Sequence, residues 1–152
     1  MLDGGTGESG YPVTEETLTT GSRLGIDLAD HRSVTMDAAL VDAADLVLTM
    51  ERSHVRTIVV DDPDAWSKTF TPKELVRRGE AVGARSPGQA LPEWLATLHE
   101  GRNRRDLLGA SAVDDVADPT NDRRYDHQSL AEELEDLVTA MVDLVWPAAA
   151  RR

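Results

Sequence analysis

An acidic stretch between residues 114 and 127 holds the densest group of side chains that could do chemistry. It contains five aspartates and one histidine: Asp114, Asp115, Asp118, Asp122, Asp126 and His127. Carboxylate oxygens suit hard cations such as Mg²⁺ and Ca²⁺. The spacing does not match a calcium-binding EF-hand loop, so we expect a solvated acidic loop and no metal or other cofactor. Asp118 precedes Pro119, a position where an aspartate often caps a turn.

Cysteine and histidine contribute little to a candidate site. The sequence contains no cysteine, which excludes disulfides, thiolate metal sites and a cysteine nucleophile within these residues. His31 lies in a predicted turn with Arg32 and Ser33. A single histidine in a turn is more often a local hydrogen-bond partner than a catalyst, so we assign it no catalytic role.

The composition indicates one soluble globular domain. The chain has 152 residues, of which 40% are hydrophobic and 29% charged, values too apolar for a disordered protein. Its formal net charge of -12 would repel nucleic acid and anionic membranes. No apolar run has the length of a membrane span, and residues 1–5 lack the features of a signal peptide. We therefore expect a cytoplasmic protein, and the sequence leaves its oligomeric state open.

Helices and strands are predicted to alternate in the first half of the chain. A helix over 14–24 has a capping threonine at its start and a glycine after its end. A second helix spans about 36–43 and is expected to be capped by Thr35 or Asp37. The continuous apolar run 46–48 is typical of a strand buried on both faces. A helix over 53–58 and a short strand over 66–70 follow. This alternation predicts an α/β fold.

The second half carries a clear helix start, a long insertion and a final helix. Residues 71–74 read Thr-Pro-Lys-Glu, a capping box with proline at the first helical position. The segment 83–114 is rich in Arg, Gly and Pro, has an amphipathic turn over 94–98, and is expected to lie over the core. Leucines and a methionine at helical spacing over 130–144 predict a helix that docks on the core.

Four short motifs follow one another in an order that carries more information than any of them alone. They are Gly25–Leu28, His31–Ser33, Ala44–Glu51 and Asp115–Pro119. In this order the chain resembles the low-molecular-weight protein tyrosine phosphatases, and its long insertion resembles an actinobacterial variety of that family.

The resemblance implies a three-layer α/β/α fold with a parallel sheet. In the family a phosphate-binding loop with a Cys and an Arg follows the first strand. Met1 falls where the family's chain has already completed that strand, the loop, the first helix and the second strand. We therefore expect residues 1–152 to form a single, incomplete phosphatase-like domain that lacks its first strands and has an insertion at about 83–114.

Asp118 is the one catalytic residue that the resemblance carries over. It matches the Asp of the family's Asp-Pro loop, which protonates the leaving oxygen. Tyrosines usually follow in the family and line the substrate slot, whereas this chain has Thr120 and Asn121. Arg85–Pro87 repeats the Arg-Ser-Pro that closes the family's phosphate loop, but Gly79 stands at the cysteine position. We therefore expect Arg85–Pro87 to be a surface loop.

Two functions remain open at this point. In the first, the complete protein is a low-molecular-weight tyrosine phosphatase acting through a cysteinyl-phosphate on a phosphotyrosine protein or small phosphomonoester. The present chain lacks the nucleophile and would be inactive by itself. In the second, the chain is a catalytically dead binding or regulatory module. An arsenate reductase on the same fold would require the same missing cysteine.

Overall fold

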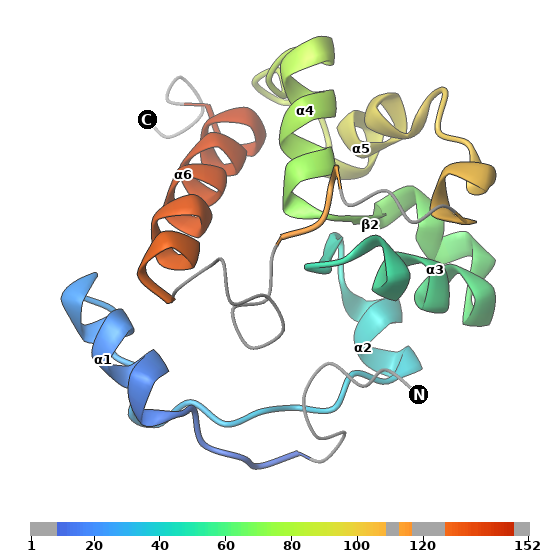
Figure 1. Cartoon of the computed structure of the whole chain (residues 1–152). Coiled ribbons are helices and arrows are strands. Elements are labelled where there is room, and N and C mark those ends of the chain that lie inside the picture. Colours follow the sequence, from blue (N-terminus) through green and yellow to red (C-terminus); the bar gives the residue numbers. More distant parts are fainter. Residues whose placement is uncertain (1–8, 109–112, 117–126, 148–152) are drawn as a thin grey trace.

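The computed structural model describes residues 9–108, 113–116 and 127–147 (Figure 1). The elements are α1 (Glu15–Arg23), α2 (Ala38–Ala43), β1 (Val47–Leu48), α3 (Arg52–Asp61), the 3₁₀ helix η1 (Pro63–Lys68), β2 (Thr69–Phe70), α4 (Pro72–Val82), α5 (Leu91–His99), the 3₁₀ helix η2 (Arg104–Leu108) and α6 (His127–Val145). The alternation of helices and strands confirms the predicted α/β class.

The two strands form a parallel pair that separates two hydrophobic clusters. Val47 lies opposite Thr69, and Leu48 lies opposite Phe70. Phe70 belongs to a cluster with residues of α4, α5 and α6, whereas Val47 packs against a second cluster formed by α2, α3 and η1. Since successive side chains of a strand point to opposite faces, the helices form layers on both sides of the strands.

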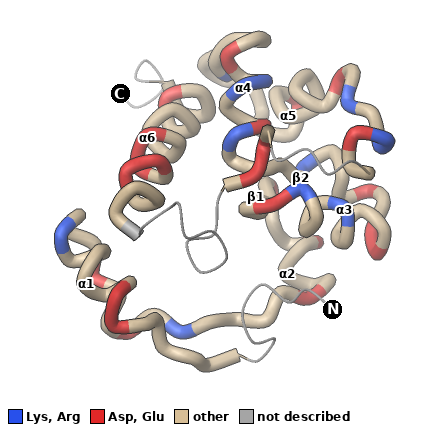
Figure 2. Tube along the Cα trace, in the orientation of Figure 1, with Lys and Arg blue, Asp and Glu red and all other residues tan. Residues whose placement is uncertain are grey.

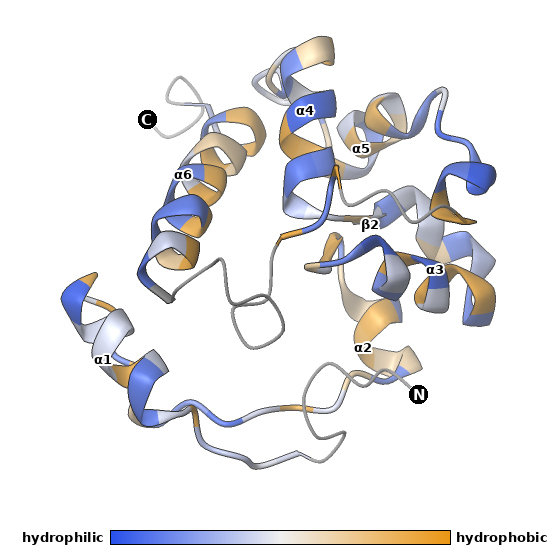
Figure 3. Cartoon of the chain, viewed as in Figure 1, coloured by the Kyte–Doolittle hydropathy of each residue, from blue (hydrophilic) through white to orange (hydrophobic). Residues whose placement is uncertain are grey.

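The larger cluster combines segments that are far apart in the sequence. Its buried members are Phe70, Leu75, Trp94, Leu95, Leu98, Met141 and Val145. Three of these come from α5, so the segment 83–114 builds part of the core, and our expectation that it lies over the core was wrong. Gly79 lets α4 and α6 pack closely, because a Cβ there would lie 2.8 Å from Cδ1 of Leu144. Figure 3 shows hydrophobic and hydrophilic residues alternating along α6.

Local signals predicted the caps of α1, α2 and α4, although α2 begins at Ala38, two residues later than expected, and α3 continues to Asp61, beyond the predicted 58. The side chains of Thr14 and Asp37 accept hydrogen bonds from the first turns of α1 and α2, and Gly25 takes a positive φ of 74° just after α1. Oγ1 of Thr71 accepts from the backbone N–H of Glu74 at 3.2 Å. The Glu74 carboxylate accepts from arginine side chains and not from the N–H of Thr71, so only the threonine half of the predicted capping box forms.

Two predictions about the strands were wrong in detail. The segment 66–70 is not a strand throughout: Trp66 lies in η1, and only Thr69 and Phe70 pair with β1. The strand at 46–48 is not buried on both faces, since Leu48 is 40% exposed. Within the described residues β1 pairs with β2 alone, so no second strand pairs with its other edge there.

The N-terminal segment lies apart from the strands. Helix α1 contacts α6, and Figure 1 shows it beside the beginning of that helix. Pro12 and Arg32 form an isolated antiparallel bridge that holds the two ends of this segment together. Among the described residues, no helix is both long and apolar enough to cross a membrane.

Candidate functional site

The carboxyl ends of the two strands form the edge where a parallel α/β sheet usually binds its ligand. Thr49 and Thr71 directly follow the strands, and both are buried. The backbone N–H of Thr49 donates to the carbonyl of Phe70 at 3.0 Å. This bond extends the pairing of the two segments by one residue beyond β1. Helices α3 and α4 both begin at this edge.

The segment that precedes Asp118 is fixed to this edge by two hydrogen bonds. The N–H of Val116 donates to the carbonyl of Met50 at 2.8 Å. Oδ1 of Asp115 accepts from the N–H of Arg52 at 2.8 Å. Val116 is 2% exposed, so its side chain is anchored as well.

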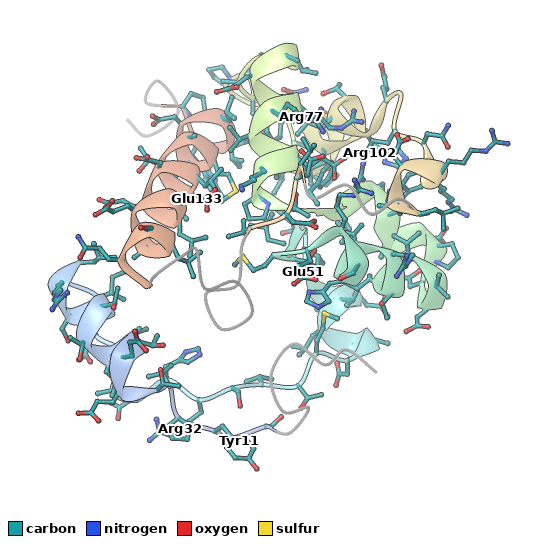
Figure 4. The ribbon with its side chains drawn as sticks, in the orientation of Figure 1. Tyr11, Arg32, Glu51, Arg77, Arg102 and Glu133 are labelled. Atoms are coloured by element: carbon teal, nitrogen blue, oxygen red, sulfur yellow. The ribbon has the colours of Figure 1, made fainter. Side chains whose placement is uncertain are left out.

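Asp115 caps α3 from a position 63 residues away in the sequence. The N-cap residue of α3, Glu51, makes no side-chain bond to the first turn's N–H groups; its carboxylate accepts from Oγ of Ser53 at 2.9 Å. The exposed N–H groups and the helix dipole favour a carboxylate here. The first two residues of the predicted Asp115–Pro119 motif therefore have a structural basis. Figure 4 labels Glu51 at this edge.

The aspartates predicted as a loop divide into two groups. Asp118, Asp122 and Asp126 lie outside the described residues. Asp114 forms a two-point ion pair with Arg77, at 2.8 and 3.1 Å. In the part of the chain that the structure describes, no three His, Asp or Glu side chains are grouped closely enough to hold a metal ion.

His31 and Arg85 have local structural roles. His31 is exposed, and its N–H donates to the carbonyl of Leu28. Nε of the Arg85 side chain donates to the carbonyl of Val145 at 2.7 Å. The backbone N–H of Arg85 donates to the carbonyl of Leu144 at 2.8 Å. Arg85 therefore fastens the loop after α4 to the end of α6.

A buried ion pair between Glu74 and Arg102 lies beside the site. Both Glu74 oxygens accept from Arg102 at 2.9 Å, and Arg102 also donates to the carbonyls of Trp66 and Thr69 at 2.6 and 2.9 Å. The Arg102 side chain is 2% exposed. Arg78 shares Oε1 of Glu74 at 3.1 Å. One carboxylate therefore joins α4 to the chain after α5.

Burial and these charges shift three pKa values. Burial lowers the pKa of Arg102, and Glu74 opposes this shift. Burial and the positive charges of Arg102 and Arg78 lower the pKa of His99, whose ring meets that of Trp66 edge-on with centroids 4.8 Å apart. The hydrogen bond to Asp114 raises the pKa of Arg77.

Known proteins share both sequence and fold with this chain. The chain is 34% identical, over 65 residues, to a low molecular weight protein-tyrosine-phosphatase of Acinetobacter johnsonii; the match covers 43% of this chain and 46% of that protein. The crystal structure of a low molecular weight protein tyrosine phosphatase from T. tengcongensis superposes with a TM-score of 0.58, at 27% identity, over 89% of this chain and 69% of that one. In part of its sequence and in its fold, the chain is similar to the low-molecular-weight protein tyrosine phosphatases.

A second solved structure has the same fold as this chain. The YwlE arginine phosphatase from Geobacillus stearothermophilus superposes with a TM-score of 0.59, at 24% identity, over 90% of this chain and 66% of that one. No family model matches the sequence. The match to the curated tyrosine phosphatase spans about half of that protein's length.

Sequence reasoning missed the role of Asp115 and the network around Glu74. The spacing of Glu74 and Arg78, four residues apart on α4, was a readable signal. Arg102 binds Glu74, 28 residues away in the sequence, and Asp115 binds the N–H of Arg52, 63 residues away. Nothing in the local pattern around either residue indicates those contacts.

Proposed function

We propose that this chain forms the general-acid part of a low-molecular-weight protein tyrosine phosphatase, whose nucleophilic cysteine is supplied from outside these 152 residues. In that reaction a thiolate attacks the phosphorus of a phosphate monoester and forms a cysteinyl-phosphate. Asp118 donates a proton to the departing oxygen. It then takes a proton from the water that hydrolyses the intermediate.

The anchoring of Val116 carries this proposal. Its N–H is bonded to Met50 at the carboxyl edge of the sheet, where such folds bind ligands. Asp118 follows two residues later, and a tether of two residues spans at most about 7 Å. The anchored Val116 therefore supports the choice of Asp118 as the acid of a site at this edge.

The proposed substrates are a phosphotyrosine protein or a small phosphomonoester. The family relation and the names of the two tyrosine phosphatases support this choice. Because the sequence contains no cysteine, the 152-residue chain alone should not hydrolyse such esters.

The test begins with the protein isolated from its own cells. Its intact mass is compared with the 16.6 kDa of this sequence, and hydrolysis of phenyl phosphate is measured on the same material. In a heavier, active protein, Asp118→Asn should lower kcat by about 10²- to 10⁴-fold, as expected when a general acid is lost. Asp122→Asn, the same change four residues later in the acidic stretch, is the control and should retain activity.

Two results would contradict the proposal. The first is a heavier, active protein whose Asp118→Asn variant keeps its kcat. The second is a protein of 16.6 kDa that hydrolyses no phosphomonoester. The second result would leave the catalytically inactive binding or regulatory module as the function.

A further inference from the structure

A cleft of about 550 Å³ lies beside the candidate site and is lined by five arginines. They are Arg52, Arg77, Arg78, Arg102 and Arg105. They come from α3, α4 and the segment after α5. Figure 4 labels Arg77 and Arg102, which come from α4 and from that segment.

The cleft carries an excess of positive charge in an acidic protein. Three carboxylates, Glu74, Asp106 and Asp114, line it alongside the five arginines. The lining therefore has a net charge of about +2, while the whole chain has a formal charge of -12. Figure 2 shows the alternation of acidic and basic residues over α4 and the neighbouring segments.

The arginines of the cleft differ in how much charge they present to solvent. Arg102 is buried and holds both oxygens of Glu74. Arg77 keeps 54% of its side chain exposed despite its ion pair with Asp114, and Arg105 is exposed on η2. Guanidinium groups bind carboxylates and phosphates through paired N–H donors. Arg77 and Arg105 are thus the groups best placed to meet an incoming anion.

The cleft adjoins the edge to which Asp115 and Val116 are hydrogen-bonded. Arg52 lines the cleft, and its N–H is the one capped by Asp115. Asp114, which pairs with Arg77, immediately precedes Asp115. A peptide bound in the cleft could therefore continue to the carboxyl edge of the strands.

We propose that this cleft binds the acidic residues that flank the phosphorylated side chain of a protein substrate. This inference rests on the proposed function. A short acidic peptide needs only a local positive site. A nucleic acid presents an extended row of phosphates, which the strongly negative remainder of the chain would repel.

The inference is tested by peptide binding to the protein isolated from its own cells, measured by fluorescence anisotropy at low ionic strength. Four peptides are used, with either tyrosine or phosphotyrosine at the centre and with either Asp/Glu or Asn/Gln at the flanking positions. Acidic flanks should tighten binding with both central residues. Since the contacts are exposed charge pairs, added salt should weaken this preference.

Arginine variants locate the preference in the cleft. Arg105→Gln should reduce the preference for acidic flanks about two- to fivefold, the effect typical of one exposed charge pair. Adding Arg77→Gln should reduce it further. Arg56→Gln removes the same charge from an exposed position on α3 that does not line the cleft, and should leave the preference unchanged. Because Arg105 is exposed, its variant remains informative even if Arg77→Gln disturbs the fold.

The possible results separate this inference from the proposed function. Equal binding of acidic and amide-flanked peptides would overturn the inference, and so would equal effects of Arg105→Gln and Arg56→Gln. A preference for acidic flanks that depends on Arg105, in a protein without phosphatase activity, would support the cleft while contradicting the proposed function.

Discussion

Replacing Arg102 by methionine should destabilise the folded protein by about 3–5 kcal/mol, the usual cost of removing one member of a buried ion pair. Methionine keeps much of the side-chain length but removes every donor. Glu74 would lose two hydrogen bonds of 2.9 Å, and the carbonyls of Trp66 and Thr69 would each lose a donor. The guanidinium carbon also lies 4.2 Å from the centre of the Phe70 ring, so a core contact is lost as well.

Urea denaturation of the natural protein, followed by circular dichroism, measures this cost. With an m-value of about 2 kcal/mol per molar urea, the midpoint should fall by about 1.5–2.5 M. Such a loss is a large part of the 5–15 kcal/mol that stabilises an ordinary domain.

Arg104→Met is the matched control. Arg104 is exposed, and the contact found for it is with the ring of Trp66 at 5.0 Å, so its replacement should cost less than about 1 kcal/mol. Equal midpoints for the two variants would refute the role given to Arg102. Replacing Glu74 by leucine in the Arg102→Met background should recover part of the loss, since no buried charge is then left alone.

Three further predictions concern the pH dependence of stability, the cap of α3 and the edge of β1. The pKa of His99 lies below its ordinary value of 6.5 in the folded protein; the unfolded state then binds the proton more readily, so stability should fall as the pH drops below about 6.5. His99→Gln should flatten this slope in denaturation curves measured at several pH values, and His54→Gln should retain it. Asp115→Ala should lower stability by about 1 kcal/mol because the first turn of α3 loses its cap, and an unchanged melting temperature would contradict the capping role. The 152-residue chain produced alone should self-associate, as measured by light scattering, because one edge of β1 is unpaired within the described residues. Leu48→Lys should reduce this association more than Val60→Lys on α3. A monodisperse monomer would count against this prediction.

Several helix caps and the fold class could be predicted from the sequence because their causes are local. Thr14, Asp37 and Thr71 bond to N–H groups within three residues of themselves, and Gly25 supplies the positive φ that ends α1. The alternation of helical and strand-like segments indicated the α/β class for the same reason. The order of the motifs indicated the phosphatase family.

The arrangement of the core could not be read in the same way. Trp66 looked like part of a strand because it is aromatic and close to Phe70. It lies instead in the 3₁₀ helix η1, and its ring contacts Arg102 and His99. Trp94 and Leu98 looked like the apolar side of a covering segment, yet they are 2% and 0% exposed within the main cluster. Periodicity shows which side of a helix is apolar, but it does not show what that side packs against.

The candidate site shows the same difference between what is local in the sequence and what depends on packing. The sequence by itself determined the residue types: an Asp-Pro motif for acid chemistry, an excess of arginine after α5, and no cysteine. Only the tertiary structure decided that Asp115 caps α3, that Glu74 is shared by Arg78 and Arg102, and that five arginines line one cleft. The reason is physical, because an ion pair depends on the distance between two side chains in space, and residues 28 or 63 positions apart are brought to that distance only by the packing of the helices that carry them.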